Sequence, residues 1–81
     1  MSQSIKPYQK ESYALDDGSF LSERQVAVLN QLAQGFSNKQ IAHILGVAEP
    51  TIKMHVSSLL RAFKVQNRVQ ILLKAKEKNF V

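Results

Sequence analysis

The sequence predicts an all-α protein, a four-helix bundle-like domain that contains a helix-turn-helix. Three observations support this class. Apolar residues recur with helical spacing from Leu21 onward, capping signals and glycines divide that region into segments, and no window alternates with the two-residue period of a strand. The 81 residues have room for a single domain.

Residues 1–20 carry no sustained period and are predicted to be a flexible N-terminal tail or linker. A proline and an Asp-Asp-Gly-Ser turn signal interrupt this stretch. The alternative is that Tyr8, Tyr13 and Leu15 pack on the domain with amphipathic spacing. The helical domain itself is expected over residues 21–81.

The first two helical segments have the same start and stop signals. The first is predicted over residues 21–34, with Ser22 and Gln25 in a capping box and Gly35 as its stop. The second begins at Ser37, where Ser and Gln at the same spacing repeat the box, and it ends at Gly46. The apolar stripe expected on the first segment is Val26, Leu29, Leu32, Ala33 and Phe36.

The third segment is predicted over residues 49–63, because a proline is tolerated in the first turn of a helix. Its apolar residues share an arc of about 100° on a 3.6-residue wheel. They are Ile52, Val56, Leu59, Leu60 and Phe63. A short helix, a tight turn with Gly46 and a longer helix form a helix-turn-helix signature, although spacing alone also allows a plain helical hairpin.

The fourth segment, over residues 67–78, has two apolar aspects. Ile71 and Ala75 share one side, which is predicted to join the core. The other side is predicted to be a dimer interface with two-fold symmetry, unless the N-terminal tail covers it. This second side comprises Val69, Leu72, Leu73 and Lys76.

The positive charge is concentrated in the second half of the chain. Eleven Lys and Arg against six Asp and Glu give a net charge of +5. Residues 1–34 have a net charge of −1, whereas residues 35–76 hold seven basic residues against Glu49, a net charge of +6. Such a focused charge predicts an anionic partner, and nucleic acid, an anionic membrane surface and an acidic protein all remain open at this point.

The outer face of the third segment favours nucleic acid among these partners. Lys53, Ser57, Arg61 and Lys64 fall together on this face, with Met54 at its edge. Lys and Arg reach phosphates or guanine, Ser hydrogen-bonds to several bases, and Met contacts a thymine methyl group. A solvated helix face is the alternative, but acidic partners at i, i+4 spacing are missing.

Metal, redox and catalytic functions lack their residue patterns. The chain has no cysteine, and its two histidines, His43 and His55, do not have metal-ligand spacing. No Gly-rich phosphate loop, HExxH motif or positioned Ser-His-Asp group occurs. No apolar run approaches the roughly 20 residues of a membrane span. We therefore expect no metal, no cofactor, no enzyme activity and no membrane partner, and a cytoplasmic protein.

Four sequence blocks follow one another in order. They are Leu-Ser-Glu-Arg-Gln at residues 21–25, Leu-Ala-Gln-Gly-Phe-Ser-Asn-Lys-Gln-Ile-Ala at 32–42, Leu-Gly-Val-Ala-Glu-Pro-Thr-Ile-Lys-Met-His-Val at 45–56 and Val-Gln-Asn-Arg at 65–68. With this spacing the chain resembles the LuxR-type (GerE-like) helix-turn-helix domain of bacterial transcription regulators over about residues 21–79.

The resemblance implies a sequence-specific transcription regulator that binds double-stranded DNA as a dimer in the bacterial nucleoid. The third helix would enter the major groove, with Lys53, Met54 and Ser57 facing the bases. Arg61 on the same face is expected to join them. The phosphate contacts implied by the resemblance are Ser37, Asn38, Lys39, Thr51, Asn67 and Arg68, to which the positions of His55 and Lys64 add two more. The fourth helix would form a weak homodimer on an inverted-repeat site.

The sequence departs from the family pattern at three positions. Ala48 replaces the usual Ser or Thr cap, Pro50 replaces a small residue, and Ser57 is shorter than the residue often found there. Family members usually carry a receiver or small-molecule-binding domain, for which 20 residues have no room, so the chain is either a free-standing regulator or an excised C-terminal part. A sigma-factor-like promoter-binding domain and a helix-turn-helix protein-interaction module are the alternative functions.

Overall fold

The computed structural model describes residues 7–81, so the first six residues of the predicted tail lie outside the described part. A short 3-10 helix and four α-helices follow one another along the chain. They are η1 (Lys10–Tyr13), α1 (Glu23–Ala33), α2 (Asn38–Leu45), α3 (Glu49–Phe63) and α4 (Arg68–Glu77). In this part of the chain the only strand-like pairing is an isolated bridge between Ala14 and Phe20. The predicted all-α class with four helices is confirmed.

The two predicted capping boxes form at the starts of α1 and α2. The hydroxyl of Ser22 accepts from the N–H of Gln25 at 3.1 Å, and the N–H of Ser22 donates to the Gln25 side chain at 2.8 Å. Ser37 and Gln40 repeat this exchange at 3.2 and 2.8 Å. Each box satisfies two polar groups that a helix end leaves without partners, so both helices begin one residue after the serine.

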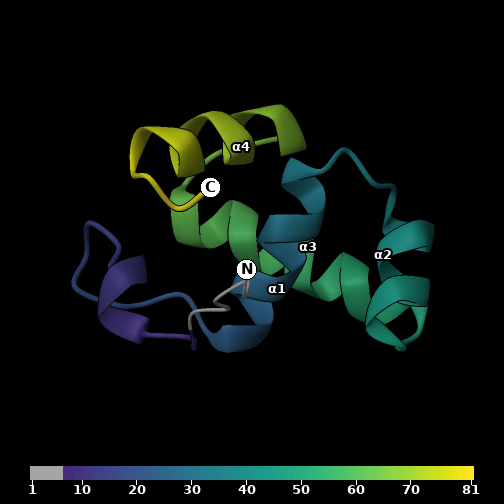
Figure 1. The fold of residues 1–81 in the computed structure, drawn as a ribbon. Coiled ribbons are helices and arrows are strands. Elements are labelled where there is room, and N and C mark those ends of the chain that lie inside the picture. The colour runs from purple at the N-terminus through teal and green to yellow at the C-terminus, as the bar shows by residue number, and fades with distance from the viewer. Residues whose placement is uncertain (1–6) are drawn as a thin grey trace, which may run out of the picture.

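Helix α3 lies at the centre of the fold and contacts the other three α-helices. Figure 1 shows α1 crossing it, with α4 at one end of the molecule and α2 at the other. The core between them is almost entirely aliphatic. Its largest fully buried side chains are Leu21, Val28, Leu29, Leu32, Ile41, Ile52, Leu59 and Ile71.

The stripe predicted for the first helix differs from the observed core at two positions. Val28 is fully buried although the prediction omitted it, and Ala33 is exposed although the prediction included it. The reason is that α1 packs against α2, α3 and α4 together. A helix with three neighbours buries a wider arc than a single stripe, which explains the burial of Val28.

The turn between α2 and α3 has the geometry of a helix-turn-helix. Gly46 adopts φ +70°, a left-handed conformation that glycine enters at little cost. Its N–H and that of Val47 donate to the last carbonyls of α2, with Val47 bonding to Ala42 at 3.0 Å. Val47 then packs on the core, and the chain enters α3 two residues later.

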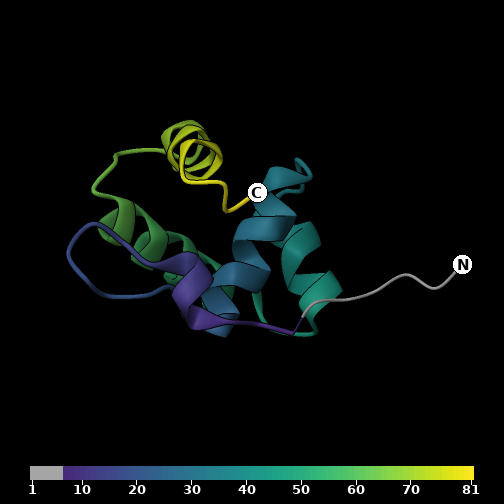
Figure 2. The same ribbon diagram turned by 60° about the vertical axis from the view of Figure 1, so that its left-hand side comes forward.

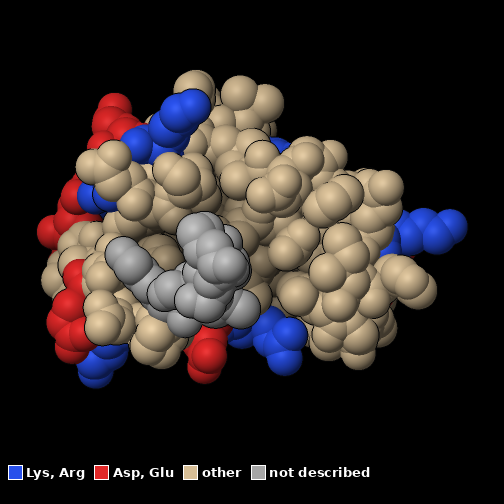
Figure 3. Space-filling view, viewed as in Figure 1, with Lys and Arg blue, Asp and Glu red and all other residues tan. Residues whose placement is uncertain are grey.

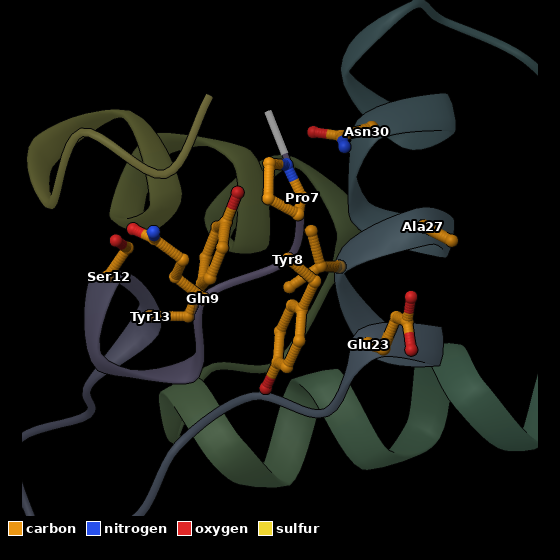
Figure 4. A pocket seen from close by; sticks show the side chains of 9 residues that line it. Pro7, Tyr8, Gln9, Ser12, Tyr13, Glu23, Ala27 and Asn30 are labelled. Atoms are coloured by element: carbon orange, nitrogen blue, oxygen red, sulfur yellow. The ribbon is translucent and has the colours of Figure 1, made fainter. Parts of the chain in front are cut away.

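Residues 7–20 pack on the helical domain, which differs from the predicted flexible tail. The Tyr8 hydroxyl donates to the carbonyl of Leu21, and the Tyr13 ring lies 5.3 Å from the buried Phe80 ring. Figure 4 shows Tyr8 between α1 and the short helix that carries Tyr13, and Figure 2 shows this segment beside the start of α1. Packing of Tyr8, Tyr13 and Leu15, the alternative considered above, is what the structure shows.

Candidate nucleic-acid interface

The residues predicted to face DNA bases lie together on the outer surface of α3. Lys53, Ser57 and Arg61 are all exposed, and their spacing of four residues places them on one side of the helix. Met54 beside them is 67% exposed. A shallow groove joins these four side chains with Pro50, His55 and Ser58, and no acidic residue lines it. The groove is therefore both accessible and positively charged.

A polar contact that sequence reasoning missed fixes the orientation of this face. Gln25 of α1 donates to the hydroxyl of Ser58 at 2.9 Å, and that hydroxyl donates to the backbone carbonyl of His55 at 2.9 Å. The same Gln25 side chain also accepts from Ser22 in the capping box. One partly buried amide thus joins the start of α1 to the middle of α3, directly behind the exposed groove.

The residues predicted to contact phosphate are divided among several helix ends. Ser37, Asn38 and Lys39 form the start of α2, and Thr51 lies half-buried in the first turn of α3. Asn67 caps α4, where its side chain accepts from the N–H of Gln70 at 2.9 Å. Helix starts present free N–H groups and a positive dipole end to an anion, so this arrangement suits phosphate.

Arg68, also predicted to contact phosphate, has its guanidinium turned into the protein. It is half-buried and donates to the backbone carbonyl of Phe36 and, at 3.5 Å, to that of Leu32. These contacts bring the start of α4 next to the loop between α1 and α2. The two sequence blocks that the family resemblance assigned to phosphate therefore lie side by side, joined by this arginine.

Lys64 lies in a different cluster from the other predicted phosphate contacts. It ends α3 in a left-handed conformation, with φ +57°, and lines a small pocket with Asp16, Asp17 and two further lysines, Lys74 and Lys78. The ion pair and hydrogen bond to Lys78 lower the pKa of Asp16. Hydrogen bonds from Ser19 lower the pKa of Asp17. The acidic turn therefore stays ionised opposite these three lysines.

The acidic residues gather at one side of the molecule. Figure 3 shows most of them on the side where residues 7–20 lie in Figure 1, while no acidic side chain is visible over the end formed by α2. The sequence of α2 has no acidic residue, and α3 has Glu49 alone. The helix-turn-helix is thus the part of the surface that an anionic partner meets with least repulsion.

The residues predicted to form a dimer face on α4 are exposed only in part. Val69 and Leu73 are 66% and 65% exposed, and their spacing of four residues places them on one side of α4. Lys76 is also exposed. Leu72, which the prediction placed with them, is instead half-buried against the core. Ile71 and Ala75 are fully buried, as predicted.

Two negative findings apply to residues 7–81. Within this range, no three His, Cys, Asp or Glu side chains gather in a way that would hold a metal ion. Across the same described residues, no helix is both long enough and apolar enough to span a bilayer.

The sequence of residues 19–75 matches the sequence model of the bacterial regulatory proteins of the luxR family. This match covers the four α-helices almost completely. The chain belongs to this family. The resemblance inferred from the four sequence blocks is therefore confirmed.

Similar proteins include two bacterial regulators. The chain is 52% identical over 54 residues to the nitrate/nitrite response regulator protein NarP of Escherichia coli K12, which covers 67% of this luxR-family chain and 25% of NarP. It is 48% identical over 60 residues to the glycerol metabolism activator of Pseudomonas putida, which covers 74% of this chain and 27% of the activator. The chain thus spans about a quarter of the length of these relatives.

A solved structure shares the fold. The response regulator ChrA of a heme-sensing two-component system superposes with a TM-score of 0.74 at 30% identity. The superposition covers 94% of this chain and 33% of ChrA. It therefore extends beyond the four helices into residues 7–20, the segment for which the sequence predicted no fixed structure.

Proposed function

We propose that this luxR-family domain is the sequence-specific DNA-binding part of a transcription regulator and that α3 enters the major groove. The observation that carries the proposal is the exposed groove on α3, where Lys53, Ser57 and Arg61 stand in one row and no acidic residue lines the surface. An α-helix fits the major groove, where side chains of these types distinguish base pairs.

The proposal divides the surface into base contacts and backbone contacts. Lys53, Met54, Ser57 and Arg61 are the base contacts because they line the α3 groove. Most of the phosphate contacts are at helix ends, where N–H groups and cations meet the backbone of the duplex. They are Ser37, Asn38, Lys39, Thr51, Lys64 and Asn67, and His55 in the middle of α3 joins them from the edge of the groove.

The proposed complex is a weak homodimer on an inverted-repeat site. Val69 and Leu73 form a small exposed apolar patch on α4, with Lys76 at its edge. A patch of this size supports only weak association, but a duplex with two adjacent half-sites holds two copies at high effective concentration. Two-fold symmetry of the pair then requires half-site centres about 10 base pairs apart.

The test is selection of bound duplexes from a random DNA pool, followed by a salt titration. We expect the selected duplexes to share an inverted repeat and the affinity to fall steeply as salt rises, because neutralised phosphates release counterions. Failure to enrich any sequence would contradict specific recognition. An affinity that does not change with salt would contradict the electrostatic contacts and favour a protein-interaction module.

A location at the bacterial nucleoid, in the cytoplasm, is part of this proposal, since it follows from DNA as the partner. A fluorescent fusion of the chain is expected to coincide with stained DNA in cells. The variant Lys53→Ala combined with Lys39→Ala is expected to spread away from the DNA. Equal distributions of the two fusions would contradict the proposed location.

A further inference from the structure

We infer that Arg68 is a positioning residue that sets the start of α2 against DNA, rather than a phosphate contact; the inference rests on the proposed DNA-binding function. Its guanidinium donates to the carbonyls of Phe36 and Leu32. These carbonyls belong to the end of α1 and to the loop that leads into α2. Arg68 itself is the first residue of α4, more than 30 positions along the chain.

Electrostatics explains why the side chain turns inward. A cation in the first turn of a helix lies at the positive end of its own helix dipole, which is unfavourable. The end of α1 offers the opposite potential, because its last carbonyls have no partners within the helix. The half-buried guanidinium of Arg68 therefore lies at the negative C-terminal end of α1 and points away from the positive N-terminal end of its own helix, α4.

The peptide group between Phe36 and Ser37 is the point through which Arg68 acts. Its carbonyl accepts from Arg68, and its N–H donates to the Gln40 side chain at 2.8 Å. Both polar ends of this one planar group are thus held, one from α4 and one from α2. Because Ser37 is the N-cap of α2, the orientation of this peptide sets the direction in which Asn38 and Lys39 enter the helix.

A planar guanidinium suits this task better than an ammonium group would. Both hydrogen bonds come from one nitrogen, Nη2, and the planar group holds its N–H donors in a fixed orientation toward the two carbonyls. A lysine carries the same charge on a flexible stem and can replace an arginine at a phosphate, where a point charge suffices. The two roles therefore predict different behaviour for Arg68→Lys and Arg68→Ala.

The first measurement is amide hydrogen exchange by NMR on the chain without DNA. In Arg68→Ala and Arg68→Lys we expect the Ser37 amide to exchange about tenfold faster, because loss of a hydrogen bond from a charged donor frees its peptide group. Amides in the middle of α3 and α4 should be unchanged. Lys39→Ala is the matched control, since its side chain is exposed in the first turn of α2, and it should leave the Ser37 amide unchanged.

The second measurement is DNA affinity over a salt series. We expect both Arg68 variants to bind the selected duplex less tightly and Lys39→Ala to lower the salt slope by about one, and adding Arg68→Ala to Lys39→Ala should lower the slope no further. The variant with Arg68→Ala and Lys39→Ala together should lose less affinity than the sum of the two losses, because both act through the start of α2.

Three results would overturn the inference. They are a salt slope that falls by about a further one when Arg68→Ala is added to Lys39→Ala, a Ser37 amide that exchanges at the original rate, and additive losses in the double variant. If Arg68→Ala does not fold, Arg68→Lys decides, because full affinity in that variant would assign Arg68 to a phosphate. Absence of binding by the unmodified chain would refute the proposed function instead, while the exchange measurement would still test the contact.

Discussion

At the scale of single residues, the proposed interface separates side chains that read bases from side chains that hold the backbone. Lys53 lies in the α3 groove, whereas Lys39 lies in the first turn of α2. Both are exposed lysines, so their chemistry is the same and only their positions differ. A comparison of these two residues therefore tests the geometry of the interface rather than its charge.

We expect Lys53→Ala to relax the preference at one base position and to cost about 1–3 kcal/mol of binding free energy on the selected site. Lys39→Ala should weaken binding to all sequences alike and lower the salt slope by about one. Competition binding with single-base variants of the site measures both effects. If the two variants lose affinity equally for every sequence, Lys53 is not a base contact.

The ion pair between Asp16 and Lys78 gives a second prediction at this scale. Contact with Lys78 lowers the pKa of Asp16 below its ordinary value of 3.8, so the folded state binds this proton more weakly than the unfolded state does. The stabilisation is therefore fully present above pH 3.8 and is lost as the pH falls through the lowered pKa. We expect Asp16→Asn to lower the melting temperature slightly at pH 7 and by less at pH 2.

The control for Asp16→Asn is the same substitution in a Lys78→Met background. Without the ammonium group, the carboxylate keeps only the weaker attraction of Lys74 and Lys64, and the substitution should have a clearly smaller effect at pH 7. The pair is exposed on the Asp16 side, so the effect should also shrink as salt rises. An equal loss at both pH values would mean that the carboxylate charge is not responsible.

At the scale of elements, α3 differs from α1, α2 and α4 at its start. Those three helices have a side-chain cap from Ser22, Ser37 and Asn67, whereas Ala48 at the N-cap of α3 provides none. Pro50 in the first turn compensates in part, since its fixed φ suits a helix and its missing N–H needs no partner. Helix α3, which we propose enters the major groove, is nevertheless the α-helix without a side-chain cap at its first turn.

We expect Ala48→Ser to stabilise the fold by about 1 kcal/mol, because Ala48 already has the extended backbone of a cap residue and a serine adds the missing acceptor. Urea unfolding followed by circular dichroism measures the change. Ser37→Ala is the matched variant at a cap that is in place, and it should cost about as much as the first variant gains. No gain in Ala48→Ser would mean that Pro50 already sets the first turn.

Helix α4 supports a prediction about assembly. Leu73 is 65% exposed, whereas its neighbour Leu72 packs on the core. We expect Leu73→Glu to leave the monomer folded and to abolish cooperative binding to the full inverted repeat, because two like charges would meet near the two-fold axis. Binding to a half-site should survive, as measured by gel shift on full and half sites.

The adjacent substitution Leu72→Glu is the control for Leu73→Glu. It places a charge against the core and should destabilise the monomer, so it should reduce binding to both DNA sites. Should Leu73→Glu still bind the full site cooperatively, the dimer contact is not on this face of α4.

At the scale of the whole molecule, aromatic side chains connect residues 7–20 with Phe80, which follows α4. The Tyr13 ring stacks on the Tyr8 ring with 5.9 Å between the ring centroids. It is tilted against the Phe80 ring, whose centroid lies 5.3 Å away, and the centroids of Phe80 and Phe63 are 6.0 Å apart. These rings form a row from the N-terminal segment through the C-terminus to the end of α3. These rings connect the N-terminal segment to the core, which is small in an 81-residue chain.

We expect Tyr13→Ala to lower the free energy of unfolding by about 2 kcal/mol, because the half-buried ring loses both apolar burial and its aromatic neighbours. Ser12→Ala, an exposed position in the same short helix, should change stability little. Urea unfolding of the two variants provides the measurement. Equal stabilities would show that the N-terminal segment contributes nothing to the fold.

The sequence by itself determined the helical part of this protein. Local rules were sufficient there: the boxes at Ser22 and Ser37, the glycine at the α2–α3 turn and the apolar period of α3 each concern residues a few positions apart. The exposed row from Lys53 to Arg61 also followed from helical period alone, because a helix puts every fourth residue on one side.

Only the tertiary structure decided which contacts join distant parts of the chain. Packing of Tyr8 and Tyr13 depends on Phe80, and the position of Leu72 depends on where α4 meets the core. The inward turn of Arg68 depends on carbonyls that lie 32 and 36 positions earlier. No periodic pattern in the sequence predicts such a hydrogen-bond partner, because it depends on how α1 and α4 pack against each other and not on either helix alone.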